Sequence, residues 1–164
     1  MSDFYTEQMV KKQATVKDVI IKAFLVALAI ASVFVVFLFP MAIVLPVGVI
    51  AIVVILIRKM NVEYEYLYVN GDLDIDKIMN KARRKRVFSA TVNDMELLAP
   101  EGNPRLEQYR NAVVADYSSG MAGARRYVLV VSGKGQITKL IFEPNDMIIE
   151  GIFMLAPRKV IRQK

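Results

Sequence analysis

The feature that most constrains this chain is a run of thirty-five residues without a charge, residues 23–57. A helix that crosses a bilayer needs about 20 apolar residues, and one continuous helix of this length would measure about 52 Å. Pro40, Pro46 and Gly48 interrupt the middle of the run, and proline removes a backbone donor and ends helices. The run therefore predicts two membrane-spanning helices joined by a tight turn.

The segments on either side of this run set the domain boundaries that we expect. Residues 1–14 favour either a short helix at the membrane surface or an irregular tail. Thr15 and Asp18 then form a T-x-x-D pattern, which is typical of the first turn of a helix. A cleaved signal peptide is an alternative, although its apolar core spans only about 7–15 residues. We therefore expect an N-terminal segment at residues 1–18, spans at 19–39 and 43–59, and a compact domain at 60–164.

Basic residues flank the predicted hairpin, and the turn inside it has none. Four lysines precede the apolar run, and Arg58 and Lys59 follow it. Because basic residues are retained on the cytoplasmic side, we expect a multi-pass protein of the cell membrane with both termini in the cytoplasm. Neither span carries an ionisable residue in its interior, whereas ion and proton pathways through membranes contain such residues. The pattern therefore argues against a channel or transporter.

Small residues repeat along one face of the first span. Ala23, Ala27 and Ala31 are spaced four residues apart, which lets helix backbones approach closely. Gly48 and Ala51 give the second span a smaller counterpart. We expect these faces to pack the two spans against each other. The alternative is that the alanines contact a partner protein or a second copy of the chain.

Residues 60–164 change to the period-two alternation of half-buried strands. Asn70-Gly71 is a strong hairpin signal, because both residue types tolerate positive φ. A broad apolar stripe at residues 147–155, preceded by Asn145 as a candidate cap, predicts one C-terminal helix. Strands are expected at residues 62–69, 72–78, 87–92, 95–99, 112–117, 126–131 and 136–142.

A dense basic run follows the second expected strand and consists of Lys81, Arg83, Arg84, Lys85 and Arg86. The first strand begins close to the second span, and at about 3.3 Å per residue the second strand brings the chain back to the same end. An anionic leaflet attracts juxtamembrane basic residues by about 1 kcal/mol each. We therefore expect this run to bind anionic lipid headgroups. The alternative is a solvated loop balanced by nearby aspartates.

Histidine and cysteine are both absent from the sequence. Their absence excludes catalytic triads built on histidine, cysteine nucleophiles and zinc sites built from either residue. Asp72, Asp74 and Asp76 lack the glycine and the final glutamate of an EF-hand. We expect them on the solvent face of a strand, with no metal and no cofactor. An enzyme that uses aspartate or lysine is a weaker alternative, and it needs a cleft where carboxylates converge.

The charge of the compact domain argues against nucleic acid as a partner. The whole chain has a formal net charge of +6, but residues 60–164 carry sixteen basic and thirteen acidic residues. This excess is small and local, whereas nucleic-acid-binding domains carry a basic patch over one whole face. We expect no binding to nucleic acid.

The order of the expected elements, seven strands followed by one amphipathic helix, resembles the pleckstrin-homology (PH) superfold. The tyrosine-rich strand, the Asn70-Gly71 turn, the aspartate-rich strand and the basic run are together similar to a bacterial family of two-span membrane proteins with a PH-like cytoplasmic domain. This resemblance covers nearly the whole chain. It implies a membrane α-helical hairpin plus an α+β domain, a seven-stranded barrel or sandwich capped by a C-terminal helix.

The resemblance implies architecture rather than chemistry, because the family is a domain of unknown function. Eukaryotic PH domains bind phosphoinositides with basic residues around the first hairpin, whereas residues 69–72 are neutral to acidic here, so that site is not transferred. We expect a membrane-anchored, non-enzymatic binding or assembly module, with an accessory subunit of a larger membrane complex as the alternative. The loop at residues 118–124 and an exposed sheet edge are the expected protein contacts.

Overall fold

The chain folds into two compact units, which are described separately. The computed structural model describes residues 4–133 and 135–163. One unit is a helical hairpin that comprises residues 13–62, and the other takes residues from both sides of it, up to Lys12 and from Glu63 onward. The hairpin is therefore inserted within the second unit, whereas the sequence predicted a separate N-terminal segment at residues 1–18.

The hairpin unit consists of two long helices and a short connection. α1 (Val16–Leu38) and α2 (Val44–Lys59) are joined by a 3-10 turn, η1 (Pro40–Ile43). Two helical segments, α1 and the stretch Pro40–Lys59 formed by η1 together with α2, are long and apolar enough to cross a membrane. The Asp18 carboxylate accepts a hydrogen bond from the Thr15 backbone N–H at 2.9 Å, as the T-x-x-D pattern predicted.

Four strands form the first sheet of the other unit, in the order β1-β2-β3-β4. The β2–β3 connection is the predicted Asn70-Gly71 turn, with φ of 48° and 103° at the two residues. Both values lie in the left-handed region that Asn and Gly tolerate best. The strands of this sheet are β1 (Tyr5–Lys11), β2 (Val62–Val69), β3 (Asp72–Met79) and β4 (Arg83–Thr91).

β1 differs from the helix or irregular tail that the sequence favoured for residues 1–14, and that expectation is wrong for this segment. The strand pairs antiparallel with β2 along its whole length, from Tyr5 opposite Val69 to Lys11 opposite Glu63. It has few apolar residues, and its partner strand lies beyond the hairpin, so the local sequence gives little sign of it. Residues 1–3 of the expected N-terminal segment lie outside the described residues.

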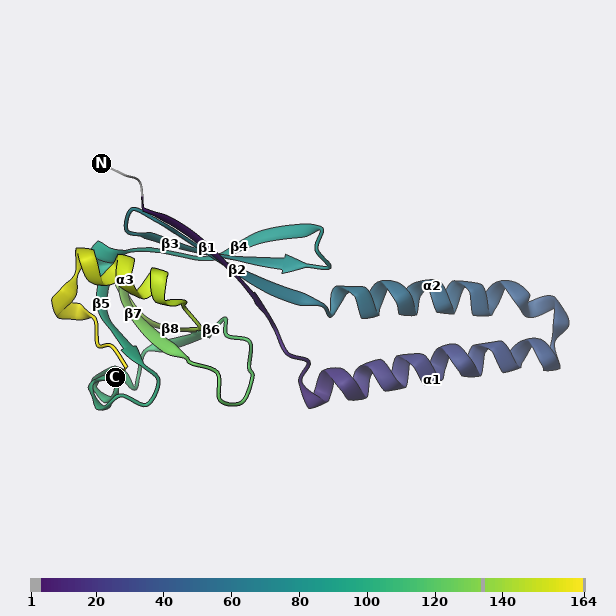
Figure 1. Cartoon of the computed structure of the whole chain (residues 1–164). Helices are drawn as coiled ribbons and strands as arrows, with labels where there is room; N and C mark the ends of the chain where they lie inside the picture. The colour runs from purple at the N-terminus through teal and green to yellow at the C-terminus, as the bar shows by residue number, and fades with distance from the viewer. Residues whose placement is uncertain (1–3, 134, 164) are drawn as a thin grey trace. The chain divides into compact units, whose positions relative to one another are not determined.

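The second sheet also has four strands, in the order β5-β7-β8-β6, and β6 pairs parallel to β8. Figure 1 shows the two sheets facing each other as layers of a sandwich. Within the described residues there are eight strands rather than the expected seven, and β1 is the additional one. The elements of this half are β5 (Met95–Pro100), β6 (Val113–Asp116), β7 (Tyr127–Gly133) and β8 (Gln136–Phe142), with the 3-10 turns η2 (Val92–Asp94), η3 (Pro104–Tyr109) and η4 (Pro157–Lys159).

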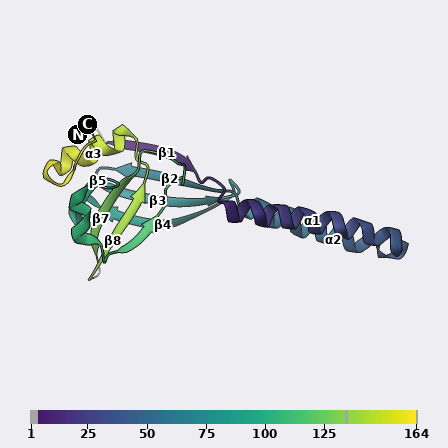
Figure 2. The same ribbon diagram turned by 90° about the horizontal axis from the view of Figure 1, so that it is seen from below.

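The predicted C-terminal helix, α3 (Asp146–Leu155), completes the core of the sandwich. The Asn145 side chain caps it by accepting a hydrogen bond from the Ile148 N–H at 2.9 Å. Ile148 and Ile152 are fully buried, so the apolar stripe faces the sheets as predicted. Figure 2 shows α3 beside β1.

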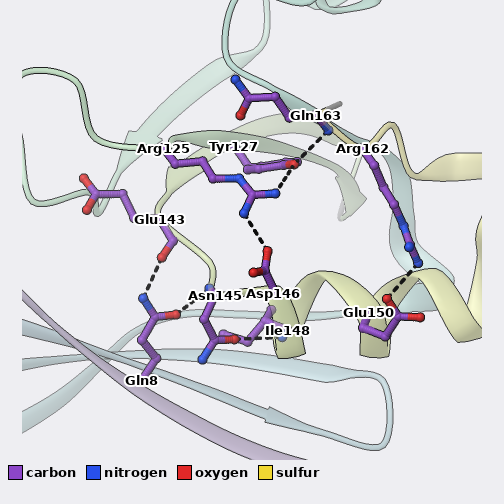
Figure 3. Close-up of polar contacts among 10 residues, drawn as sticks. All are labelled: Gln8, Arg125, Tyr127, Glu143, Asn145, Asp146, Ile148, Glu150, Arg162 and Gln163. Carbon is purple, nitrogen blue, oxygen red and sulfur yellow. Dashed lines mark hydrogen bonds and ion pairs between the residues drawn. The ribbon is translucent and has the colours of Figure 1, made fainter.

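Polar side chains also fasten the start of α3 to β1 (Figure 3). The Gln8 amide group donates to the Glu143 carbonyl at 2.8 Å, and its oxygen accepts from the Asn145 N–H at 2.7 Å. Arg125 forms an ion pair with Asp146 at 2.5 Å in the first turn of the helix. β1 is thus held by the last helix through side chains as well as by β2 through backbone hydrogen bonds.

Candidate functional site

The predicted basic run forms the β3–β4 turn and the first half of β4. We expected a strand only from residue 87, whereas β4 begins at Arg83. Asn80 and Lys81 shape the turn with φ of 52° and 56°, a conformation that asparagine adopts more readily than lysine. The expectation of a loop is therefore wrong for residues 83–86 and correct for the turn itself.

This turn lies at the end of the first sheet from which the chain connects to the hairpin. β1 ends there at Lys11, and β2 begins there at Val62. β3 runs back to the same end after the Asn70-Gly71 turn. Only residues 12–15 and 60–61 separate these strands from α1 and α2. The basic turn and both covalent connections to the hairpin thus share one end of the sheet, as the strand lengths predicted.

The strand register divides the basic residues between the two faces of the β3–β4 ribbon. Arg84 lies opposite Ile78 and Arg86 lies opposite Asp76, whereas Lys85 lies opposite Lys77. Residues that are opposite each other across two strands have their side chains on the same face. The two arginines therefore share one face of the ribbon, and Lys85 shares the other face with a lysine.

Acidic residues of β2 and β3 neutralise the arginine face. Arg84 pairs with Glu65 at 2.6 Å, and Arg86 pairs with Asp74 at 2.8 Å and with Asp76 at 3.1 Å. Glu65 and Asp76 are only 3% and 6% exposed, and a buried carboxylate that loses its partner destabilises the fold strongly. Arg84 and Arg86 therefore serve the stability of the sheet.

Glu65 extends this charge cluster to β1. Burial raises the pKa of the Glu65 carboxyl, and a hydrogen bond with Glu7 raises it further. The Tyr5 hydroxyl donates a hydrogen bond to Glu7 at 2.8 Å, which is the largest cause that lowers the pKa of Glu7. Sequence reasoning missed Glu65, because its alternation with the buried tyrosines of β2 places it on the solvent face.

The three aspartates of β3 differ in their exposure. Asp72 is exposed and Asp74 is half-buried, as expected for the solvent face of a strand, but that expectation is wrong for Asp76, which is buried against Arg86. Within residues 4–133 and 135–163, no group of three or more acidic side chains is arranged to hold a metal ion.

The other members of the basic run remain accessible to a ligand. Lys81, Arg83 and Lys85 are exposed, and none of them forms an ion pair with another described residue. The five residues expected to bind lipid thus separate into two arginines that hold the sheet together and three residues whose charge is available to an anion.

The small-residue face of α1 is turned away from α2. Ala23, Ala27 and Ala31 are all exposed in the hairpin unit, whereas Ser32 of α1 and Val53 of α2 are buried. The expectation that the alanines pack the two helices together is wrong, because α1 uses a different face for that contact. The alanine face is therefore exposed in the hairpin unit.

An open cavity of about 400 Å³ lies between β4 and the second sheet. Its walls include Phe88, Asp94 and Val131. Asp94 accepts a hydrogen bond from the Thr91 hydroxyl at 3.0 Å, and no second carboxylate lies on the described wall. The cavity therefore does not bring together the carboxylates that an enzyme of the aspartate type needs.

The loop expected to contact a protein is only partly accessible. Ser118 and Ser119 are buried, and their hydroxyls donate to Asp116 and to Glu143, each at 2.7 Å. Residues 120–123 are exposed. The first half of the loop is therefore part of the fold, and only the second half is available to a partner.

Comparisons with known proteins agree with this architecture. A family model described as a bacterial PH-like domain (DUF6106) matches residues 2–162. Neither the curated proteins nor the solved structures give a significant match. The family match covers the hairpin as well as the parts of the domain on either side of it, and it confirms the predicted fold class. The chain therefore belongs to the bacterial PH-like domain family, whose function is unknown.

Proposed function

We propose that this protein is a membrane-anchored binding module whose PH-like domain rests on anionic lipid through the β3–β4 turn. In this proposal α1 and α2 cross the bacterial cell membrane, both termini lie in the cytoplasm, and the domain binds rather than catalyses. One observation carries the proposal: Lys81, Arg83 and Lys85 lie at the end of the first sheet from which both connections to the hairpin leave.

The pairing of β1 with β2 supports a hairpin that crosses the membrane twice. Lys11 and Glu63 lie opposite each other in one sheet, so they are on the same side of any membrane. The chain between them must then cross an even number of times, and it contains two helices of sufficient length. The basic residues at both ends of the hairpin favour the cytoplasmic side.

Electrostatics supports lipid as the ligand of the turn. Each exposed cation near an anionic leaflet contributes about 1 kcal/mol, and this attraction acts within a Debye length of about 8 Å at physiological salt. Only the short segments 12–15 and 60–61 connect this end of the sheet to the helices. Arg84 and Arg86 contribute less to this attraction, because buried carboxylates already neutralise them.

A single fluorescent label tests the proposal cleanly, because the chain has no cysteine of its own. Ala82→Cys places a fluorophore in the basic turn, and Asn93→Cys places it beyond the other end of β4. Full-length protein is reconstituted in nanodiscs of phosphatidylcholine, with or without phosphatidylglycerol, that contain a lipid-attached quencher. We expect quenching at residue 82 that increases with phosphatidylglycerol and weakens with salt, and little quenching at residue 93.

A charge variant provides the control for this experiment. Changing Lys81, Arg83 and Lys85 together to Gln leaves the ion pairs of Arg84 and Arg86 in place, so the fold should be retained. This variant should lose the part of the quenching that depends on phosphatidylglycerol. Equal quenching at residues 82 and 93, or quenching at residue 82 that ignores both lipid charge and salt, would contradict the proposal.

A second candidate function is that of an accessory subunit in a larger membrane complex. The exposed face formed by Ala23, Ala27 and Ala31 favours it, because small residues at this spacing pack closely against other helices. Native mass spectrometry of the protein released with its own lipids separates the two functions. A stoichiometric second protein would support the accessory role, and a lone chain or homo-oligomer that retains anionic lipid would support lipid contact.

A further inference from the structure

One face of the β3–β4 ribbon carries three cations close together. Lys77 and Lys85 lie directly opposite each other, and Arg83 lies opposite Met79, two residue pairs nearer to the turn and on the same face. Side chains at directly opposite positions have Cβ atoms about 5 Å apart. Arg83 and Lys85 are exposed and Lys77 is half-buried. These three charges are therefore within reach of one small ligand.

This face is the inner face of the sheet. Lys77 follows the fully buried Ile75 by two residues, so both side chains project from the same side of β3. Phe88 lies opposite Ile75, and Val87 is an extra residue that shifts the register, so that Lys85 also lies on the inner face. The lysine pair is thus the continuation of the core-facing side of the ribbon.

An aromatic cluster ends the core just before this lysine pair. The ring of Tyr117 lies 5.4 Å from that of Tyr64 and 6.5 Å from that of Phe88. The Tyr117 hydroxyl donates to the Val87 carbonyl at 3.2 Å, which ties the second sheet to β4 at this point. Beyond these rings, the inner face of the ribbon is cationic and accessible.

The charges on the two faces of the ribbon are balanced differently. The arginines of the outer face meet buried carboxylates. On the inner face, Lys77, Arg83 and Lys85 form no ion pair with any described residue. Like charges directly opposite each other in a sheet repel, so an anion placed between them would stabilise this arrangement.

We propose that Lys77, Arg83 and Lys85 form a binding site for a phosphate-bearing anion. Lysine offers phosphate oxygens a compact charge with three donors, and arginine offers a planar pair of donors. A lipid headgroup and a soluble phosphate ester present the same oxygens to these side chains. With a lipid headgroup as the ligand, the site rests on the proposed function. It adds Lys77 to the residues that contact the ligand, and Lys77 lies outside the basic run seen in the sequence.

Two phosphate probes test the site on the full-length protein in phosphatidylcholine nanodiscs. One is inorganic phosphate in solution, and the other is phosphatidic acid in the bilayer. Lysine-selective carbon-13 labelling lets NMR follow the Lys77 and Lys85 side chains. We expect both signals to shift with at least one probe, and Lys77→Gln and Lys85→Gln each to weaken binding about fivefold. Lys11→Gln makes the same charge change at the same end of the sheet but outside the site, and it should weaken binding less than either of these substitutions.

The outcomes separate the site from the proposed function. A response to phosphatidic acid alone identifies a lipid headgroup as the ligand, and a response to inorganic phosphate identifies a site open to soluble phosphate; both support the proposal. No response of Lys77 to either probe, or equal weakening by Lys11→Gln, overturns it. Lipid quenching at residue 82 without a response of Lys77 refutes the site and keeps the lipid contact. A response to inorganic phosphate without that quenching refutes the lipid contact and keeps the site.

Discussion

The hydroxyl groups of Tyr66 and Tyr68 belong to the same buried face of β2 but differ in their hydrogen bonds. The Tyr66 hydroxyl donates to the Tyr117 carbonyl at 2.6 Å and accepts from the Glu143 N–H at 3.3 Å. The Tyr68 hydroxyl is buried and has no hydrogen-bond partner among the described residues. Alternation in the sequence predicted the shared face of these tyrosines. It did not predict which hydroxyl is satisfied, because the partners come from distant parts of the chain.

This difference leads to opposite effects of the same substitution. Tyr66→Phe should lower the free energy of unfolding by about 1–2 kcal/mol, because two buried backbone groups lose their partner. Tyr68→Phe removes only an unpaired buried hydroxyl, so the stability should be unchanged or slightly higher. Urea unfolding of the full-length protein in detergent, followed by circular dichroism, measures both. Equal losses in the two variants would contradict this account.

Alkaline pH extends the same comparison. Burial raises the pKa of the Tyr68 phenol from 10.0 to about 12, so the folded state binds this proton more tightly than the unfolded state. The free energy of unfolding is therefore unaffected by this group below pH 10 and falls as the pH rises toward 12. Tyr68→Phe should lose less stability than the wild type over that interval.

At the level of elements, local patterns predicted β2, β3, α1, α2 and α3, but not β1 or the start of β4. β1 has its partner on the far side of the hairpin, and a local pattern carries no information about such a partner. In β4, Arg84 and Arg86 pair with the buried carboxylates of Glu65 and Asp76. The start of this strand therefore lacks the alternation of apolar and polar residues from which a strand is predicted. The alanine spacing of α1 indicated which residues permit close packing, but not which face packs.

The contact of α3 with the first sheet depends on a residue without a side chain. A Cβ atom at Gly151 would lie 2.5 Å from the rings of both Phe4 and Tyr68. Gly151→Ala gains about 1 kcal/mol of helix propensity, but overpacking a core costs about 1–3 kcal/mol, so we expect a net loss of stability. Thermal unfolding by circular dichroism measures this loss as a lower melting temperature.

Gly133→Ala is the matched control for this substitution, because a Cβ at that position meets no atom within 4 Å. It should leave the melting temperature unchanged or raise it slightly. If the two variants had the same melting temperature, the rings of Phe4 and Tyr68 would have moved aside without a loss of stability. The close packing of α3 would then not limit the stability of the domain.

At the scale of the whole molecule, the hairpin occupies the position of a simple turn between two neighbouring strands. Lys11 at the end of β1 lies opposite Glu63 in β2. Replacing residues 12–62 with Asn-Gly should therefore give a water-soluble domain with its sheet intact, because a two-residue turn of this kind suits the twist of paired strands. Size-exclusion chromatography and the dispersion of its NMR spectrum test whether the variant is monomeric and folded.

A variant that begins at Glu63 is the appropriate comparison. It lacks β1, so the edge of β2 is exposed and the hydrogen bonds of Gln8 to the start of α3 are lost. We expect it to aggregate or to remain unfolded. A well-dispersed spectrum from this shorter variant would show that β1 is dispensable.

The interruption of the first sheet also has a consequence during protein synthesis. β1 emerges from the ribosome before the two helices and β2 emerges after them, so about fifty residues are made before the strands can pair, which at about 5–20 residues per second takes roughly 3–10 s. Until β2 is made, β1 is an unpaired strand, and its polar residues limit its association with other nascent chains. These residues are Thr6, Glu7, Gln8 and Lys11. In the proposed topology, completion of the domain therefore follows the insertion of the hairpin in time, and a chain with a misplaced hairpin would carry an incomplete sheet that quality-control proteases could recognise.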